Sequence, residues 1–304
     1  MASLILNVTE ALPPKVTEIE LLATSEKSEK EQREHNQRWF MRLSYRGADF
    51  CGWQRQPTSP SVQQTLEESM RTVLRRPVPV TGAGRTDTGV NARVMWVHFD
   101  ARIGEFDPPA LIKALNQLCG GSIAVSELRK VRPDAHARFD AVSRTYRYVV
   151  LFEKNPFLCG LSWRCFSKLD IEKMNKAASL LPAVSDFTSF AKLHSDAKTN
   201  LCKVTEARWN TLADDSEIRW PADGVVFTVT ADRFLRNMVR AIVGTLVDVG
   251  RGKLSLERFV EIIEAKDRCA AGQSMPAEAL YLWDITYPDT IWLDDVSYNI
   301  DSNK

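Results

Sequence analysis

The hydrophobic pattern of the chain changes period early, and this change limits the fold more than any other feature. Apolar and polar residues alternate over residues 39–45, which is the period of two of a half-buried strand. Ser61 is followed three positions later by Gln64, a capping-box pattern. Apolar residues then recur at helical spacing, at Val62, Leu66, Met70, Val73 and Leu74. The first folded unit is therefore predicted to be a strand, a loop and a helix.

The same mixture of short strands and helices continues along the chain. Further strand patterns lie at residues 78–81, 94–99, 122–132, 144–152, 202–210 and 224–231, and helix patterns at 107–119, 170–181, 233–248 and 255–266. The elements alternate loosely, without the regular short βα units and continuous apolar strands of a doubly wound parallel sheet. We therefore expect an α+β fold of two pseudo-repeated halves, with mixed or antiparallel sheets and flanking helices.

Charge and composition divide the chain into four segments. Residues 1–38 are expected to be a peripheral N-terminal extension, 39–140 and 141–288 the two halves, and 289–304 an acidic tail. The whole chain has 40 Lys and Arg against 39 Asp and Glu, whereas residues 39–288 carry 34 basic and 28 acidic side chains. This mild excess is compatible with a phosphate-contacting surface, but a solvated face of a neutral enzyme would look the same.

Cysteine spacing and apolar runs exclude several classes of protein. The six cysteines include no CxxC pair and have no His at ligand spacing, so neither a zinc site nor a disulfide framework is expected. The apolar runs are well short of the roughly 20 residues that cross a bilayer, and the N-terminus lacks a secretory signal pattern. We therefore expect a cytoplasmic protein with no membrane partner.

The most unusual segment is the glycine-rich stretch 82–92, which contains Arg85 and Asp87. Three glycines allow tight turns and close approach of the backbone to a ligand. In an extended loop, residues two positions apart point the same way, so Arg85 would lie near Asp87, stabilise its charged form and grip phosphate. A β-turn with a structural Arg–Asp pair explains the spacing equally well.

Residues 84–90 resemble the signature around the catalytic Asp of the tRNA pseudouridine synthase A family. Further blocks that resemble this family lie at residues 50–56, 137–140, 144–148, 186–190, 234–240 and 276–282. They occur in the family's order and cover about residues 39–288. Two residues depart from the pattern: Thr88 stands where Ala is more common, and Asn91 where His is usual. Neither is the nucleophile, so the implied reaction is unaffected.

The resemblance implies an enzyme that isomerises uridine to pseudouridine in the anticodon stem-loop of tRNA, at tRNA positions 38 to 40. Asp87 is implied to act as the nucleophile, on the sugar or on the base, or as the base of an elimination; the sequence leaves these routes open. No metal or organic cofactor is implied. The family architecture is two α+β halves across a positively charged active-site cleft, commonly in a homodimer.

The resemblance also implies roles for residues around Asp87. Tyr146 is implied to contact the uracil and to assist proton transfer, and Arg240 to pair with the carboxylate. Without the resemblance, an ordinary strand Tyr and a solvated helical Arg are the commoner interpretations. Leu280 is implied to pack against the base, although a Leu is far more often a core residue.

Four more residues are candidates for RNA contacts. Arg144 and Arg236 belong to basic blocks that would line a groove for the tRNA backbone, and their neutralisation of phosphate would weaken binding as salt rises. A solvated surface explains any single Arg of these blocks equally well. Trp53 and Gln54 follow the first strand, and Trp53 would serve equally as a core anchor.

Two other functions fit the same residues. A catalytically silent RNA-binding protein would use the scaffold without its chemistry, but such a protein would be free to lose Asp87 and Arg85. A hydrolase would use Asp87 to cleave an N-glycoside and release the base. Free uracil in the product would separate hydrolysis from isomerisation, in which nothing leaves the RNA.

Overall fold

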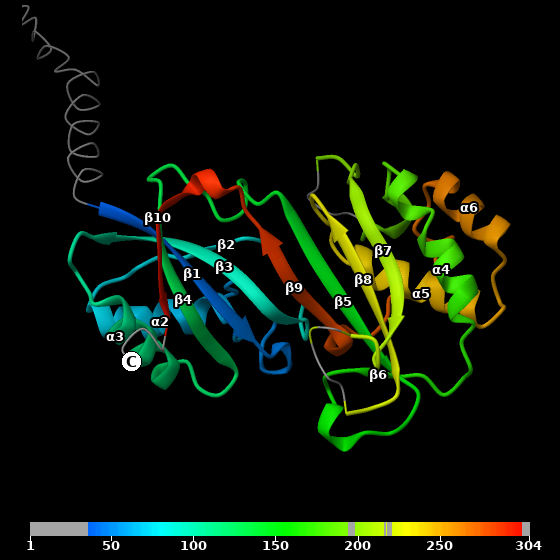
Figure 1. The fold of residues 1–304 in the computed structure, drawn as a ribbon, viewed down its shortest axis with the longest axis horizontal. Helices are drawn as coiled ribbons and strands as arrows, with labels where there is room; N and C mark the ends of the chain where they lie inside the picture. Colours follow the sequence, from blue (N-terminus) through cyan, green and yellow to red (C-terminus); the bar gives the residue numbers. More distant parts are fainter. Residues whose placement is uncertain (1–35, 194–197, 216, 218–220, 300–304) are drawn as a thin grey trace, which may run out of the picture.

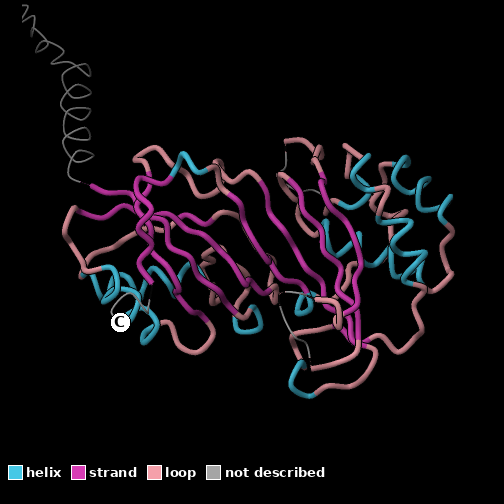
Figure 2. Tube along the Cα trace, viewed as in Figure 1, coloured by secondary structure: helices cyan, strands magenta, loops and turns pink. Residues whose placement is uncertain are grey.

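One mixed sheet runs through the part of the chain that the computed structural model describes, residues 36–193, 198–215, 217 and 221–299. Its strand order is β10-β4-β1-β3-β9-β5-β8-β7, with β2 beside β3 and β6 beside β5 (Figures 1 and 2). The strands are β1 (Asn36–Tyr45), β2 (Thr81–Gly82), β3 (Asn91–Arg102), β4 (Ile123–Val131), β5 (Ser143–Leu151), β6 (Trp163–Arg164), β7 (Val204–Thr211), β8 (Gly224–Ala231), β9 (Leu280–Thr286) and β10 (Trp292–Asn299). The α+β class is confirmed, but the strands of the two halves form one continuous sheet.

Helices gather at the two ends of this sheet. They are α2 (Val62–Leu74), α3 (Pro108–Leu118), α4 (Ile171–Ala178), α5 (Met238–Gly250) and α6 (Leu256–Ala265). Figure 1 shows α2 and α3 at one end and α4, α5 and α6 at the other. The predicted N-cap is confirmed, because the Ser61 hydroxyl accepts from the Gln64 N–H at 3.2 Å, whereas the Gln64 side chain donates to Glu68 at 3.0 Å instead of closing a capping box. None of the helices in the described residues is long and apolar enough to span a membrane.

The two ends of the sheet meet at β9. This strand pairs with β5 in the antiparallel direction and with β3 in parallel, the latter only through Asn91 opposite Tyr281 and Ala92 opposite Leu282. The sequence pattern did not predict β9. A segment close to the end of the chain therefore joins the N-terminal half to the C-terminal half beside the start of β3.

Two large hydrophobic cores lie on either side of this junction. One combines β1, β3 and β4 with α2 and α3, and the other combines β5, β7 and β8 with α4, α5 and α6. Tyr146 is partly buried and packs against both cores. Its ring therefore lies at the boundary between the halves.

The ends of the chain differ in what the structure describes. Residues 1–35, most of the expected extension, lie outside the described residues, as do residues 300–304. Residues 292–299, which the sequence sets apart as an acidic tail, form β10 at the edge of the sheet, where Trp292 pairs with Val131 of β4. The guanidinium of Arg129 lies 4.0 Å from the centre of the Trp292 ring. These contacts make β10 part of the N-terminal half.

Two predicted elements have different bounds. The strand expected at residues 78–81 is reduced to the two residues of β2, because Pro77 and Pro79 have no N–H to donate to a neighbouring strand. The helix expected from residue 233 begins only at Met238. Asn237 takes a left-handed conformation with φ 66°, and its amide donates to the Ser274 hydroxyl at 2.6 Å. Residues 232–237 are therefore a loop between β8 and α5.

Candidate active site

Asp87 lies in the loop between β2 and β3. The segment before α2 that contains Gly52 and Trp53 packs against the backbone of this loop. The Trp53 N–H donates to the Thr86 carbonyl at 3.2 Å, and the Thr86 hydroxyl bonds to the Tyr45 phenol at 2.8 Å. Gly52 has φ 91°, and a Cβ atom there would lie 2.5 Å from the Thr86 carbonyl oxygen. Only glycine therefore fits at position 52. The close packing of the two backbones holds the Asp87 backbone in place.

Trp53 belongs to this support and not to the surface. Its side chain is 3% exposed, and a Cβ at Gly82 would lie 2.6 Å from an atom of its indole ring. Of the two interpretations that the sequence allows, the structure favours the core anchor over the RNA contact. Gln54, the next residue, is exposed.

Arg236 is the cation that reaches Asp87. Its Nε atom lies 3.4 Å from Asp87 Oδ1, and the two side chains are 61% and 27% exposed. Arg236 belongs to the loop between β8 and α5, where its carbonyl accepts from the Lys192 N–H at 3.0 Å. An ion pair this open to water contributes little to stability, so a bound ligand can replace either partner at small cost.

Arg240, which the resemblance pairs with Asp87, has a different partner in the structure. Its Nε donates to the Met275 carbonyl at 2.5 Å, and the Met275 N–H donates back to the Arg240 carbonyl at 3.1 Å. Because α5 begins only at Met238, Arg236 lies before the helix and Arg240 lies in its first turn. The expected pairing of Arg240 with the carboxylate is thus taken by Arg236.

Arg85 lies on the open side of the loop. Thr86 is buried while Arg85 is exposed and Asp87 is partly exposed, so both charged side chains face away from the core, as the period of two predicts. Within the described residues, however, the ion pair of Asp87 is with Arg236, and Arg85 has no carboxylate within pairing distance. The expected Arg85–Asp87 pair is therefore not formed, and the Arg85 guanidinium is open to solvent.

Tyr146 lies near enough to Asp87 for the carboxylate charge to act on its phenol. It lies on β5 between Val229 and Leu282, and its ring meets Phe234 edge to face at 4.9 Å between centroids. Burial raises the pKa of Tyr146 to about 12; the charge of Asp87 adds to this, while Arg144 opposes it. The phenol therefore remains a neutral hydrogen-bond donor across the physiological pH range.

Leu280 is the first residue of β9 and is 5% exposed. It pairs with Tyr148 of β5, and the short turn before it packs against the Asp87 loop, since a Cβ at Gly89 would touch Ala277 at 3.4 Å. Leu280 is thus a wall residue close to the loop. Its implied role against the base stays a prediction.

Arg144 is an internal link rather than a surface cation. Its guanidinium donates to four carbonyls at 2.5 to 3.3 Å, those of Ala83, Arg138, Ala141 and Asp232. Burial lowers the pKa of this guanidinium. Ala83 begins the Asp87 loop and Asp232 begins the Arg236 loop, so Arg144 connects the backbones that carry the two charged partners. The RNA contact expected from the sequence stays a prediction.

Sequence reasoning missed two residues near the site. Phe234 lies in the block 234–240 that resembles the family, but the resemblance implies no role for it; in the structure its ring packs on Tyr146. Asn91 was noted only as a departure from the family pattern. Its amide donates to the Glu278 carbonyl at 2.7 Å and accepts from the Gly47 N–H at 2.8 Å. The departure from the usual His at this position is the sequence signal that marks Asn91.

The arrangement as a whole can bind a flat, polar group beside a carboxylate. Asp87 supplies a nucleophile or a base, Arg236 and Arg85 supply positive charge, and Tyr146 with Phe234 supplies an aromatic surface and a neutral proton donor. These groups come from both halves of the chain.

Comparison with known proteins agrees with the arrangement. A family model described as tRNA pseudouridine synthase matches residues 177–288. The chain is 53% identical over 260 residues to tRNA pseudouridine synthase A of Porphyromonas gingivalis, which covers 84% of this chain and 99% of the relative. It is 48% identical to the Bacteroides thetaiotaomicron protein of the same name, over 87% of this chain and 96% of the relative. The Bacillus subtilis protein of that name is 36% identical, over 81% and 97%.

Proposed function

This chain belongs to the tRNA pseudouridine synthase A family, and we propose that it isomerises uridine to pseudouridine in the anticodon stem-loop, at tRNA positions 38 to 40. Membership makes it an RNA pseudouridine synthase, an isomerase that modifies tRNA. With tRNA as its substrate, we propose that it acts in the cytoplasm. The family resemblance further implies a homodimer, for which sedimentation of the purified protein is the test.

The reaction exchanges one bond for another without a change of oxidation state. The bond between N1 of uracil and C1′ of ribose breaks, the uracil rotates, C5 bonds to C1′, and the C5 proton is lost as N1 gains one. We propose that the carboxylate of Asp87 is the nucleophile, because it lies at the boundary of the halves, partly exposed, with its backbone fixed by Trp53 and Gly52.

The other residues prepare the site for this step. A stacked uridine must leave the RNA helix at a cost of a few kcal/mol. The Tyr146 ring, held by Phe234, would stack on the flipped uracil and recover part of that cost, and its neutral phenol is placed to serve the proton transfer at C5. Arg236 balances the charge of Asp87 before substrate binds and is free to turn to a phosphate afterwards.

The observation that carries this proposal is the pairing of Asp87 with Arg236, which brings one loop from each half to a single point. The test uses an unmodified tRNA transcript that contains the anticodon arm, and maps every pseudouridine formed. We expect conversion only at positions 38 to 40 and no free uracil, and no conversion in a matched transcript with cytidine at those positions. Free uracil would identify a hydrolase, and pseudouridine elsewhere in the tRNA would refute the position assignment.

A further inference from the structure

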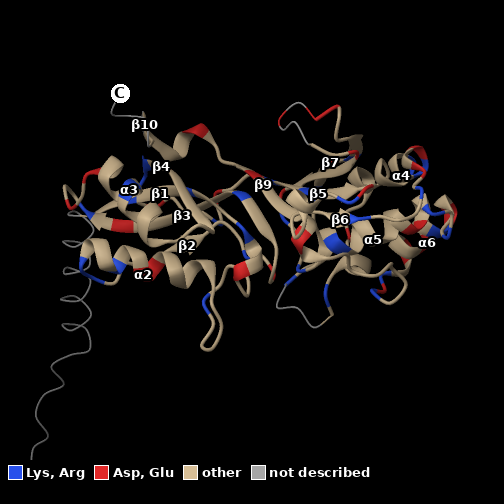
Figure 3. Ribbon diagram, turned by 90° about the horizontal axis from the view of Figure 1, so that it is seen from below, with Lys and Arg blue, Asp and Glu red and all other residues tan. Residues whose placement is uncertain are grey.

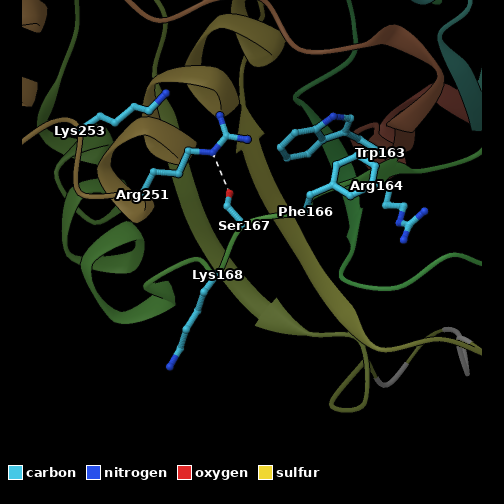
Figure 4. Close-up of a pocket in the computed structure, with 7 residues that line it drawn as sticks. All are labelled: Trp163, Arg164, Phe166, Ser167, Lys168, Arg251 and Lys253. Atoms are coloured by element: carbon cyan, nitrogen blue, oxygen red, sulfur yellow. Dashed lines mark hydrogen bonds between the residues drawn. The ribbon is translucent and has the colours of Figure 1, made fainter.

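A second feature lies at the C-terminal end of α5, away from the Asp87 loop. A hollow of about 600 Å³, here called the basic hollow, is lined by Trp163, Arg164, Phe166, Ser167, Lys168, Arg251 and Lys253 (Figure 4). Four of these seven residues are cations, and no carboxylate of the described residues lines the hollow. Acidic and basic residues are interspersed over α4 and α6 nearby (Figure 3). The chain as a whole has only one excess positive charge, so the hollow is a local concentration of cations.

Contacts within the basic hollow orient its two arginines. The Arg251 Nε donates to the Ser167 hydroxyl at 3.1 Å, and its guanidinium lies 5.6 Å from the centre of the Trp163 ring. The Arg164 guanidinium lies 4.5 Å from the centre of the Phe166 ring. The Phe166 side chain is 84% exposed, so its ring is open to a ligand.

A purely structural explanation accounts for only part of this group. Arg251 and Lys253 follow the last residue of α5, where positive charge favours the negative end of the helix dipole. That effect does not involve Arg164 or Lys168, which lie in and after β6, and it gives no reason to expose Phe166. Cations beside an exposed aromatic ring are the combination that binds single-stranded nucleic acid, through phosphate contacts and base stacking.

The position of the hollow relative to Asp87 follows from α5. Arg236, the partner of Asp87, lies two residues before this helix, and Arg251 follows directly after it. Thirteen residues at about 1.5 Å each separate the two ends by roughly 20 Å. A strand of a nucleic-acid duplex advances roughly 3.4 Å per phosphate, so this distance corresponds to about six nucleotides. One RNA molecule can therefore reach both places.

We propose that the basic hollow binds the sugar-phosphate backbone of the tRNA substrate, with one base stacked on Phe166, while the target uridine lies beside Asp87. This inference rests on the proposed function, because it assigns the same RNA to both places. The hollow then supplies affinity and register on the RNA but takes no part in the chemical step. Removal of its cations or of the Phe166 ring is therefore expected to raise KM.

The first test is the salt dependence of binding to an unmodified tRNA transcript, measured by fluorescence anisotropy. Lys168→Gln/Lys253→Gln removes two exposed cations, and Lys173→Gln/Lys176→Gln on α4 removes two as a matched control. Each lost phosphate contact lowers the slope of log affinity against log salt by about 0.7 to 0.9. We expect this slope to decrease by about 1.4 to 1.8 for Lys168→Gln/Lys253→Gln and to stay unchanged for the control. Equal slopes for both variants and the native protein would overturn the proposal.

The second test separates stacking from charge. Phe166→Ala removes an exposed ring, so folding is unaffected, and loss of one stacked base is expected to weaken tRNA binding roughly tenfold. In turnover assays this loss of affinity should appear as an increase in KM. A decrease confined to kcat would contradict a binding role. If the native protein forms no pseudouridine while both sets of variants change tRNA binding as expected, the proposed reaction fails and the RNA site stands.

Discussion

The guanidinium of Arg236 lies 3.4 Å from the carboxylate of Asp87, although 149 residues separate the two along the chain. The pair exists because two loops, one from each half, are fixed at the junction made by β9. Both side chains are partly open to water, which suits a contact that changes when RNA enters. The site is thus assembled by the fold and is absent from either half alone.

Replacement of Arg236 should lower activity without unfolding the protein. Arg236→Gln removes the charge that we propose turns from Asp87 to a phosphate of the RNA, and loss of one charge-assisted hydrogen bond of about 1.5 kcal/mol corresponds to roughly a tenfold decrease in kcat/KM. Arg240→Gln should act differently: it removes the bond to Met275, and the main change should be in the free energy of unfolding. Steady-state kinetics and urea denaturation of both variants give the comparison; equal kinetic losses with equal stability would contradict these roles.

Replacement of Arg144 should reduce stability more than that of any exposed Arg. Arg144→Ala leaves four carbonyls without their donor, and we expect the free energy of unfolding to fall by about 3 kcal/mol. Arg144→Lys should recover only part of this, because an ammonium cannot reach carbonyls in several directions. Chemical denaturation measures the effect. Native stability together with weakened tRNA binding would instead support the RNA contact that the sequence suggested.

The buried phenol of Tyr146 predicts a pH dependence of stability. Its pKa is about 12 in the folded protein and about 10 in the unfolded chain, so the unfolded state releases the proton first as pH rises. The stabilisation is complete below pH 10 and is lost between pH 10 and about 12, by about 2 to 3 kcal/mol. Tyr146→Phe should flatten this decline when unfolding is followed across that range. An unchanged slope would mean that the phenol is not buried.

The Asn91 amide should be replaceable by a side chain with the same hydrogen-bonding groups. Asn91→Ala loses the bonds to Gly47 and Glu278 and is expected to cost about 2 kcal/mol of unfolding free energy. Neutral histidine offers one donor and one acceptor, as the amide does, so Asn91→His should retain more stability than the alanine variant. Thermal denaturation of the two variants measures their stability. If Asn91→His is less stable than Asn91→Ala, histidine does not replace the hydrogen bonds of the Asn91 amide.

Local signals in the sequence predicted the local structure well. Ser61 with Gln64 marked the start of α2, and Asp107 before two prolines marked the start of α3. The alternation over residues 39–45 identified β1. Each of these features depends on neighbours within about four residues, which the sequence displays directly.

The sequence pattern could not predict contacts between distant segments. The parallel pairing of β9 with β3 rests on two residue pairs, and nothing local to residues 280–286 specifies it. A continuous helix from residue 233 would place Arg236 and Arg240 on one face, but the left-handed Asn237 separates them. The choice of Arg236 over Arg240 as the partner of Asp87 therefore follows from one backbone conformation.

The most direct test of the account is the single-turnover rate of pseudouridine formation by Asp87→Asn on an unmodified tRNA transcript. Asp289→Asn, which removes an exposed carboxylate beyond the other end of β9, is the matched control. We expect the first variant to bind tRNA and form no detectable pseudouridine, and the control to match the native rate. Pseudouridine formation by Asp87→Asn at the native rate would show that another group carries the reaction.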